Sequence, residues 1–396
     1  MRSRSYPLIN SYIFTNFKEY FNNCKFMIPT YSTGNPLLDF FFTLFNGIAE
    51  VPLFSSPITG ILILAGVFVA SWKAGAMMAL SGLIGAGMAI AFGAPYSLVT
   101  FGLFGYNSIL TGMALWSGPF VKLNKATFFL SVFGAAITAV TWMAFSHLMG
   151  DLFILDGIKH SWAIPGFTSS FIFTTWAMMY AAKRFGHDIW PAPPTAPPKE
   201  ELISGSGNPA PTDNFKWTAK EFMIATLKGV SQVTFVENWK TGIFWVVGLT
   251  LAFELAPMLS GQARPWFTNG YTSQWNEFSP LYLAGLMALL GSGIGVALAI
   301  LNKLPTAEIR LGLHGFNQVL VMIALTSFVP LTVQSFFMAV LATVACSVVV
   351  MPALQRFFGM WGLPALTGPF VFTAWVFLLG ISGFMHIPAG IGWSRP

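Results

Sequence analysis

The stretches GLFGYNSILTG (102–112) and GLHGFNQVLVM (312–322) repeat one phrase, Gly-Leu-x-Gly-aromatic-Asn-x-x-Leu, within a single chain. Both lie in strongly apolar surroundings, where the amides of Asn107 and Asn317 need hydrogen-bond partners. Paired glycines let the backbone leave helical geometry or approach a neighbouring helix closely. Small residues are common where membrane helices pack closely. The duplication favours a further interpretation, in which two equivalent broken or tilted helices face each other and line a passage.

Two further phrases occur twice, and all three phrases have the same order in both copies. The offset between the copies changes from phrase to phrase, so insertions separate them, and the polar stretch 258–279 is the candidate in the second copy. A chain that repeats in this way is typical of membrane channels and transporters. The additional pairs are GIAEV (47–51) with GVSQV (229–233), and PGFTSSFIFTTW (165–176) with PALTGPFVFTAW (364–375).

The composition indicates an all-α polytopic membrane protein. Of the 396 residues, 55% are hydrophobic and only 9% are charged, against about 25% charged in an average soluble domain. Several apolar runs approach the roughly 20 residues of a membrane helix, and the alternating pattern of a membrane β-barrel is absent. The net charge of +6 comes from bases scattered at segment ends, which favours membrane lipid over nucleic acid as a partner.

We divide the chain into four segments. Residues 1–35 form an N-terminal segment in which we expect an interfacial helix, and residues 184–220 form a solvated linker rich in Pro, Gly and Ser. We call residues 36–183 the first half and residues 221–390 the second half. Each half has room for about five membrane helices, and an odd number of spans would make the two halves inverted repeats.

Polar residues at matching positions are the candidate site. Glu50 and Gln232 occupy the fourth positions of the GIAEV and GVSQV phrases, where an acid or amide within a membrane is a functional hypothesis by default. Thr168 and Thr367 match in the third phrase, although a membrane threonine often bonds its own helix. We find no metal-binding spacing, nucleotide-binding loop or catalytic triad, so we expect no enzyme, no cofactor and no metal.

These phrases resemble the urea transporter family over residues 36–385, in both halves. The resemblance implies two inverted repeats of five membrane helices, each with a re-entrant tilted pore helix, in a homotrimer with one pore per subunit. It also implies passive passage of urea, stacked between rings and bonded to rows of oxygen atoms. Carried over by residue, the lining consists of the polar pair Glu50 and Gln232, the wall residues Val51 and Val233, the outer positions Leu53 and Phe235, the ring pair Tyr106 and Phe316, the constriction Leu110 and Leu320, and the central pair Thr168 and Thr367.

The sequence departs from the family pattern after the polar pair, with Ser55-Ser56-Pro57 in the first half and Glu237-Asn238-Trp239 in the second. The leading hypothesis is a passive urea facilitator, a multi-pass protein of the inner (plasma) membrane. Alternatives stay open: a channel of the same fold for a short-chain amide, ammonia or water, a proton-coupled carrier that uses Glu50 and His314, and a scaffold whose passage is blocked.

Overall fold

The computed structural model describes residues 35–54, 56–117, 120–121, 123–151, 165–182, 215–251, 283–329 and 331–382. Within these ranges all regular structure is helical. The expected N-terminal helix, most of the linker and the polar stretch 258–279 lie outside the described residues.

The helices of the two halves follow each other in a matching order. In the first half they are α2 (Pro36–Ala49), α3 (Pro57–Ala70), α4 (Trp72–Ala91), α5 (Tyr96–Phe101), α6 (Gly105–Gly112), α7 (Lys125–Asp151) and α8 (Ser169–Ala182). In the second half they are α10 (Ala219–Ser231), α11 (Trp239–Leu251), α14 (Ala284–Leu301), α15 (Thr306–Leu311), α16 (Phe316–Phe328), α17 (Val333–Ala345), α18 (Met351–Gly359) and α19 (Gly368–Ser382).

Short polar residues start several of these helices. The Ser56 hydroxyl accepts a hydrogen bond from the Thr59 amide at 3.3 Å, and Pro57 follows as the first helical residue of α3. Thr332 and Ser335 form a reciprocal capping box at the start of α17. These caps satisfy backbone N–H groups that have no partner inside the helix.

Several helices have the length and apolar character of membrane spans. In the described part of the chain, four stretches are long and apolar enough to cross a membrane, and shorter apolar helices accompany them. Large apolar side chains such as Phe129 and Phe337 are exposed, as expected for surfaces that face lipid. The four stretches are Trp72–Ala91, Lys125–Ser146, Ala284–Leu301 and Val333–Gly359.

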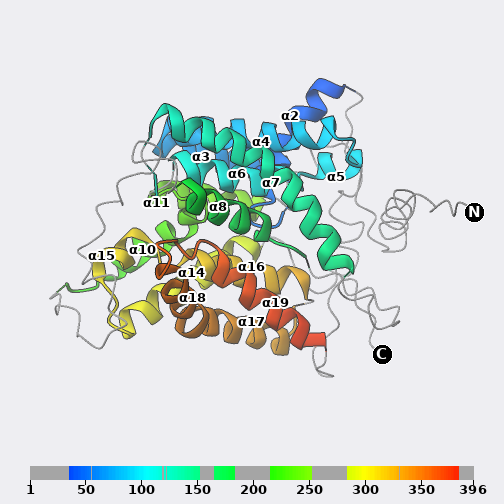
Figure 1. Cartoon of the computed structure of the whole chain (residues 1–396). Helices are drawn as coiled ribbons and strands as arrows, with labels where there is room; N and C mark the ends of the chain where they lie inside the picture. Colours follow the sequence, from blue (N-terminus) through cyan, green and yellow to red (C-terminus); the bar gives the residue numbers. More distant parts are fainter. Residues whose placement is uncertain are drawn as a thin grey trace, which may run out of the picture.

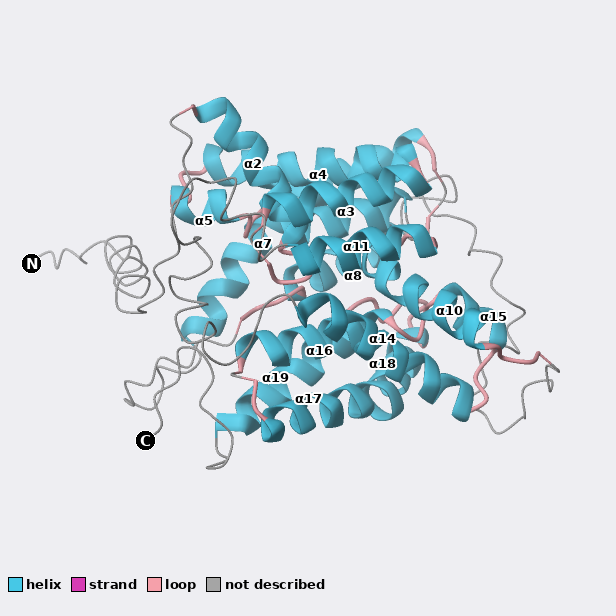
Figure 2. Cartoon of the chain, turned by 180° about the vertical axis from the view of Figure 1, so that it is seen from behind, coloured by secondary structure: helices cyan, strands magenta, loops and turns pink. Residues whose placement is uncertain are grey.

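The halves meet along α3 and α11, which pack against each other. Figure 1 shows most helices of the first half above those of the second, with α8 and α11 in between, and the reverse view in Figure 2 agrees. The Thr59 hydroxyl donates to the Gly248 carbonyl at 2.9 Å, and the Thr241 hydroxyl donates to the Gly66 carbonyl at 2.7 Å. The two bonds are reciprocal between the halves.

Candidate functional site

The first glycine of the repeated phrase breaks a helix in each half. α5 ends before Gly102 and α15 ends before Gly312, and both glycines have left-handed φ angles, +101° and +83°. A Cβ on Gly102 would lie 2.5 Å from the carbonyl carbon of Asn46, and one on Gly312 would lie 2.5 Å from the nitrogen of Gly229. Glycine is therefore required here, both for the turn and for the close approach of α2 and α10.

Asn107 holds the turn that precedes α8. Its amide nitrogen donates to the Phe167 carbonyl at 3.1 Å, and its oxygen accepts from the Phe171 amide at 3.1 Å. The Tyr106 hydroxyl also donates to the Phe167 carbonyl, at 2.6 Å, and accepts from the Trp142 indole at 3.2 Å. The Phe167 carbonyl thus has two side-chain donors.

Asn317 holds the turn before α19 in the same way. It donates to the Leu366 carbonyl at 3.3 Å and accepts from the Phe370 amide at 3.1 Å. Phe316, at the position of Tyr106, has no hydroxyl, so the second of the two donors is missing here. The repeated Asn is therefore a clamp on a distant turn, a partner that the sequence did not reveal.

The two clamped turns bring the threonines together. Phe167 and Leu366 have left-handed φ angles of 48° and 53°, and each directly precedes a threonine. The hydroxyl oxygens of Thr168 and Thr367 lie 2.6 Å apart, and both residues are fully buried. A polar pair contributed by both halves therefore sits in the apolar interior.

A pair of tryptophans fixes this junction. The Trp176 indole donates to the Pro364 carbonyl at 2.8 Å, and the Trp375 indole donates to the Pro165 carbonyl at 3.0 Å. Each bond runs from a helix of one half to the turn of the other. The exchange ties the turn before each threonine to a helix of the other half.

Turns of similar backbone follow α2 and α10. We call residues 50–54 the Glu50 turn and residues 232–238 the Gln232 turn. Leu53 and Phe235 occupy left-handed positions in them, with φ angles of 70° and 58°. The Gln232 amide nitrogen donates to the Leu311 carbonyl at 2.9 Å, which leaves the amide oxygen as an acceptor.

Glu50 differs from Gln232 in its partners. One carboxyl oxygen, Oε1, is buried and accepts no hydrogen bond from any residue that the structure describes. Helix α2, which Glu50 follows, packs against α6, which carries Tyr106. The Gln232 side chain thus has a backbone partner, whereas this Glu50 oxygen has none among the described residues.

The remaining candidate residues are mostly apolar and buried. The Phe235 ring of the second half lies 5.9 Å from the Phe171 ring on α8, so it contacts the helix that Thr168 precedes. Leu53 packs against the core with an aliphatic side chain at the matching position. Val51, Val233, Leu110 and Leu320 are fully buried, Tyr106 is nearly so, and Phe316 is half-buried.

His314 has a local partner. Its Nε2 lies 3.1 Å from the Glu308 carboxylate on α15. Phe104 takes the matching position in the first half and packs against Trp142 at 4.6 Å. Among the described residues no group of three or more His, Cys, Asp or Glu could hold a metal ion.

Comparison with known proteins decides the family. A model of the family described as "Urea transporter" matches residues 8–155, 152–260 and 279–388. Urea transporter 1 of Ovis aries is 27% identical over 389 residues, covering 95% of this chain and 84% of the relative. Urea transporter 1 of Rattus norvegicus is 28% identical over 361 residues, with 87% and 77% covered.

The chain belongs to the urea transporter family. It is a multi-pass integral membrane protein of a transporter family, which is not an enzyme family. Membership agrees with the apolar, membrane-length helices of the structure and suggests urea transport.

Sequence reasoning missed several residues that organise this urea transporter family member. Thr59 and Thr241 lie eight residues after the GIAEV and GVSQV phrases and form the reciprocal bonds between α3 and α11. Their spacing from Glu50 and Gln232 is the same in both halves, which is the signal that could have identified them. The Lys228–Glu237 ion pair has no matching signal, because the first half has Asn46 and Ser55 at those positions.

Proposed function

We propose that this protein is a passive, channel-like facilitator of urea in the inner (plasma) membrane. The observation that carries the proposal is the 2.6 Å contact between the hydroxyls of Thr168 and Thr367, one from each half. Two oxygen atoms at a buried junction of apolar helices suit a small solute with N–H donors. They place polar partners where the path across the protein would otherwise be dry.

We further propose that the halves are inverted repeats, each with five membrane helices and a re-entrant pore helix built around the Gly102 or Gly312 break. The reciprocal bonds of Thr59 and Thr241 between α3 and α11 support this arrangement, because a two-fold relation between halves produces such pairs. The family resemblance adds the homotrimer with one pore per subunit.

In the proposed path, urea meets acceptors at both ends and in the middle. Urea is flat and neutral and carries four N–H donors, and each donor buried without a partner would cost about 1–3 kcal/mol. Glu50 and Gln232 supply oxygens at the ends, and the threonine hydroxyls supply them at the centre. Apolar walls between these sites keep binding weak enough for release. The wall residues are Val51, Val233, Leu53, Phe235, Tyr106, Phe316, Leu110 and Leu320.

The central step is an exchange of hydrogen bonds. As urea passes, Thr168 and Thr367 give up their mutual bond and bond the solute instead, so neither hydroxyl is left without a partner. Ions cannot make this exchange, because two hydroxyls among apolar side chains cannot replace a hydration shell. The central threonine pair and its apolar surroundings therefore favour small neutral solutes.

Stopped-flow measurement of urea permeability in proteoliposomes tests the proposal. We expect urea flux well above that of empty vesicles, unaffected by an uncoupler and without accumulation against a gradient. Flux equal to that of empty vesicles, in protein shown to be folded, contradicts the proposal. Accumulation that an uncoupler abolishes supports the proton-coupled carrier.

A second candidate substrate is another small neutral solute, such as a short-chain amide. Leu53 favours it, because this aliphatic residue stands at the position that matches Phe235 of the second half. An aliphatic side chain can contact the methyl group of an amide as well as a flat solute. Parallel measurements with formamide and acetamide separate the two. Acetamide flux without urea flux would assign the substrate to the short-chain amides.

A further inference from the structure

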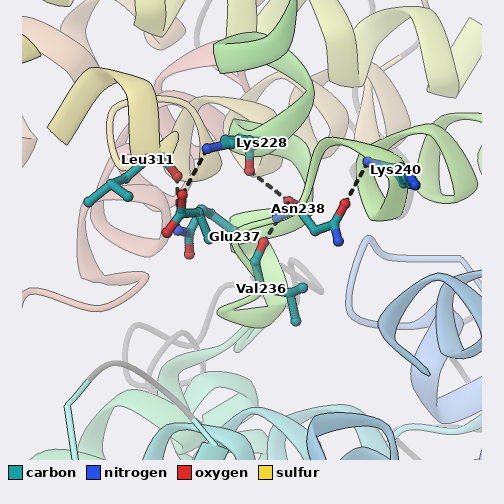
Figure 3. Close-up of polar contacts among 8 residues, drawn as sticks. Lys228, Val236, Glu237, Asn238, Lys240 and Leu311 are labelled. Atoms are coloured by element: carbon teal, nitrogen blue, oxygen red, sulfur yellow. Dashed lines mark hydrogen bonds and ion pairs between the residues drawn. The ribbon is translucent and has the colours of Figure 1, made fainter. Parts of the chain in front are cut away.

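An ion pair closes the Gln232 turn from outside. The Lys228 ammonium group lies 2.8 Å from the Glu237 carboxylate, and Figure 3 shows this contact next to Leu311. Lys228 belongs to the last turn of α10, and Glu237 stands two residues before α11. The pair therefore joins the two ends of the segment that carries Gln232, Val233 and Phe235.

Hydrogen bonds hold the same turn from within. The Ser231 hydroxyl donates to the Val236 carbonyl at 2.6 Å and accepts from the backbone N–H of Asn238 at 3.4 Å. The Asn238 side chain accepts from the Lys240 amide at 2.9 Å, where α11 begins. Figure 3 shows these contacts around Val236, Asn238 and Lys240.

The geometry that these contacts hold is one that the chain disfavours. Phe235 has a left-handed φ angle of 58°, which is unfavourable for a residue with a Cβ. Its ring reaches Phe171 of the other half, and the Gln232 amide reaches Leu311. Movement of the turn would shift both side chains at once.

In the described part of the first half, no ion pair holds the Glu50 turn. Asn46 and Ala49 stand at the positions of Lys228 and Ser231, and neither can form an ion pair. Asn46 instead donates to the Thr100 carbonyl at 2.7 Å on α5. The ion pair is therefore particular to the second half and does not follow from the duplication of the fold.

We infer that Lys228 and Glu237 are positioning residues for solute passage: their ion pair holds the Gln232 turn so that the Gln232 amide oxygen and the Phe235 ring keep their places. This inference rests on the proposed function. The pair is partly exposed, with 20% and 45% of the two side chains accessible, so its strength falls as salt rises.

The test compares urea permeability of Glu237→Gln, Lys228→Gln and the charge swap Lys228→Glu/Glu237→Lys in proteoliposomes, normalised to protein. We expect each single variant to lower urea flux about two- to fivefold, the range that partly exposed ion pairs give, and the swap to restore most of it. Molar salt should lower wild-type flux toward that of Glu237→Gln and leave Glu237→Gln unchanged. Lys240→Gln is the matched control, since it removes a charge from the same region outside the pair and should keep wild-type flux.

The ratio of urea to acetamide permeability separates positioning from a merely structural role. A loss of folded protein lowers both fluxes together, whereas a displaced Gln232 turn lowers the ratio. Wild-type flux and ratio in both single variants, or a swap as slow as the singles, overturns the inference alone. Wild-type protein that carries no urea overturns the proposed function, and this inference with it.

Discussion

The Glu50 turn and the Gln232 turn have similar backbones and different side-chain support. Both carry a left-handed residue, Leu53 or Phe235, three positions after the polar residue. The Gln232 turn is held by an ion pair, a buried hydroxyl and the bond to Leu311. Glu50 has a buried carboxyl oxygen with no partner among the described residues.

In this duplicated fold, the residues that fix the backbone are shared by the two halves, whereas the side chains that support the two turns are not. The glycines at 102 and 312 and the asparagines at 107 and 317 do the same work in both halves, because the close approach and the clamped turn leave little choice of residue. The residues around the polar pair vary, because several side chains can stabilise a turn. We therefore expect variants at the clamps to have large effects and variants at the two turns to have smaller, unequal ones.

The largest effect is expected at the clamps, and it should be greater in the second half. Asn317→Ala leaves the Leu366 carbonyl and the Phe370 amide without their side-chain partner, at about 1–3 kcal/mol for each buried group. Asn107→Ala costs less, because the Tyr106 hydroxyl still donates to the Phe167 carbonyl. Thermal unfolding in detergent measures both. Equal losses would show that Tyr106 does not compensate.

Substitution of the central threonines should affect flux more than stability. Thr168→Val or Thr367→Val removes one hydroxyl and leaves the other without its partner. A loss of about 1.4 kcal/mol, within the range for an unsatisfied group, corresponds to about tenfold slower urea flux. The double variant should be slower than either single variant but by less than the product of the two effects, since the residues are in contact. Unchanged flux in folded single variants would remove the pair from the path.

Much of the fold could be predicted from the sequence. Apolar runs of sufficient length indicate membrane helices, and the repeated phrases indicate two related halves. The helical membrane class is confirmed by the structure and the family match. The expectation that Thr168 and Thr367 form a central pair came from the resemblance; the structure brings them together, and their role in passage stays a prediction. Partners of Asn107 and Trp176 could not be predicted, because each bonds a backbone carbonyl, and carbonyls carry no sequence signal.

A smaller effect is expected when the polar residues of the two turns are exchanged. Gln232→Glu loses the N–H that donates to the Leu311 carbonyl, so urea flux should fall about threefold, the effect of a modest hydrogen bond. Glu50→Gln keeps an acceptor oxygen and breaks no hydrogen bond within the described residues, so flux should stay within about twofold. Stopped-flow permeability compares the two. A greater loss in Glu50→Gln would reverse the proposed order of the turns.

The smallest effect is expected from Leu53→Phe, which gives the Glu50 turn a ring at the position where the Gln232 turn has Phe235. The left-handed backbone at Phe235 holds a phenylalanine at a φ angle of 58°, so the same side chain adds little strain at Leu53, where φ is 70°. An aromatic contact contributes about 0.5–1.5 kcal/mol beyond buried area, and a second ring should stack on flat urea better than on methyl-bearing acetamide. We therefore expect the ratio of urea to acetamide permeability to rise about twofold, with Phe235→Leu lowering it. If Leu53→Phe instead abolished both fluxes, the Glu50 turn would have no room for a ring, and the two turns would differ in space as well as in side-chain support.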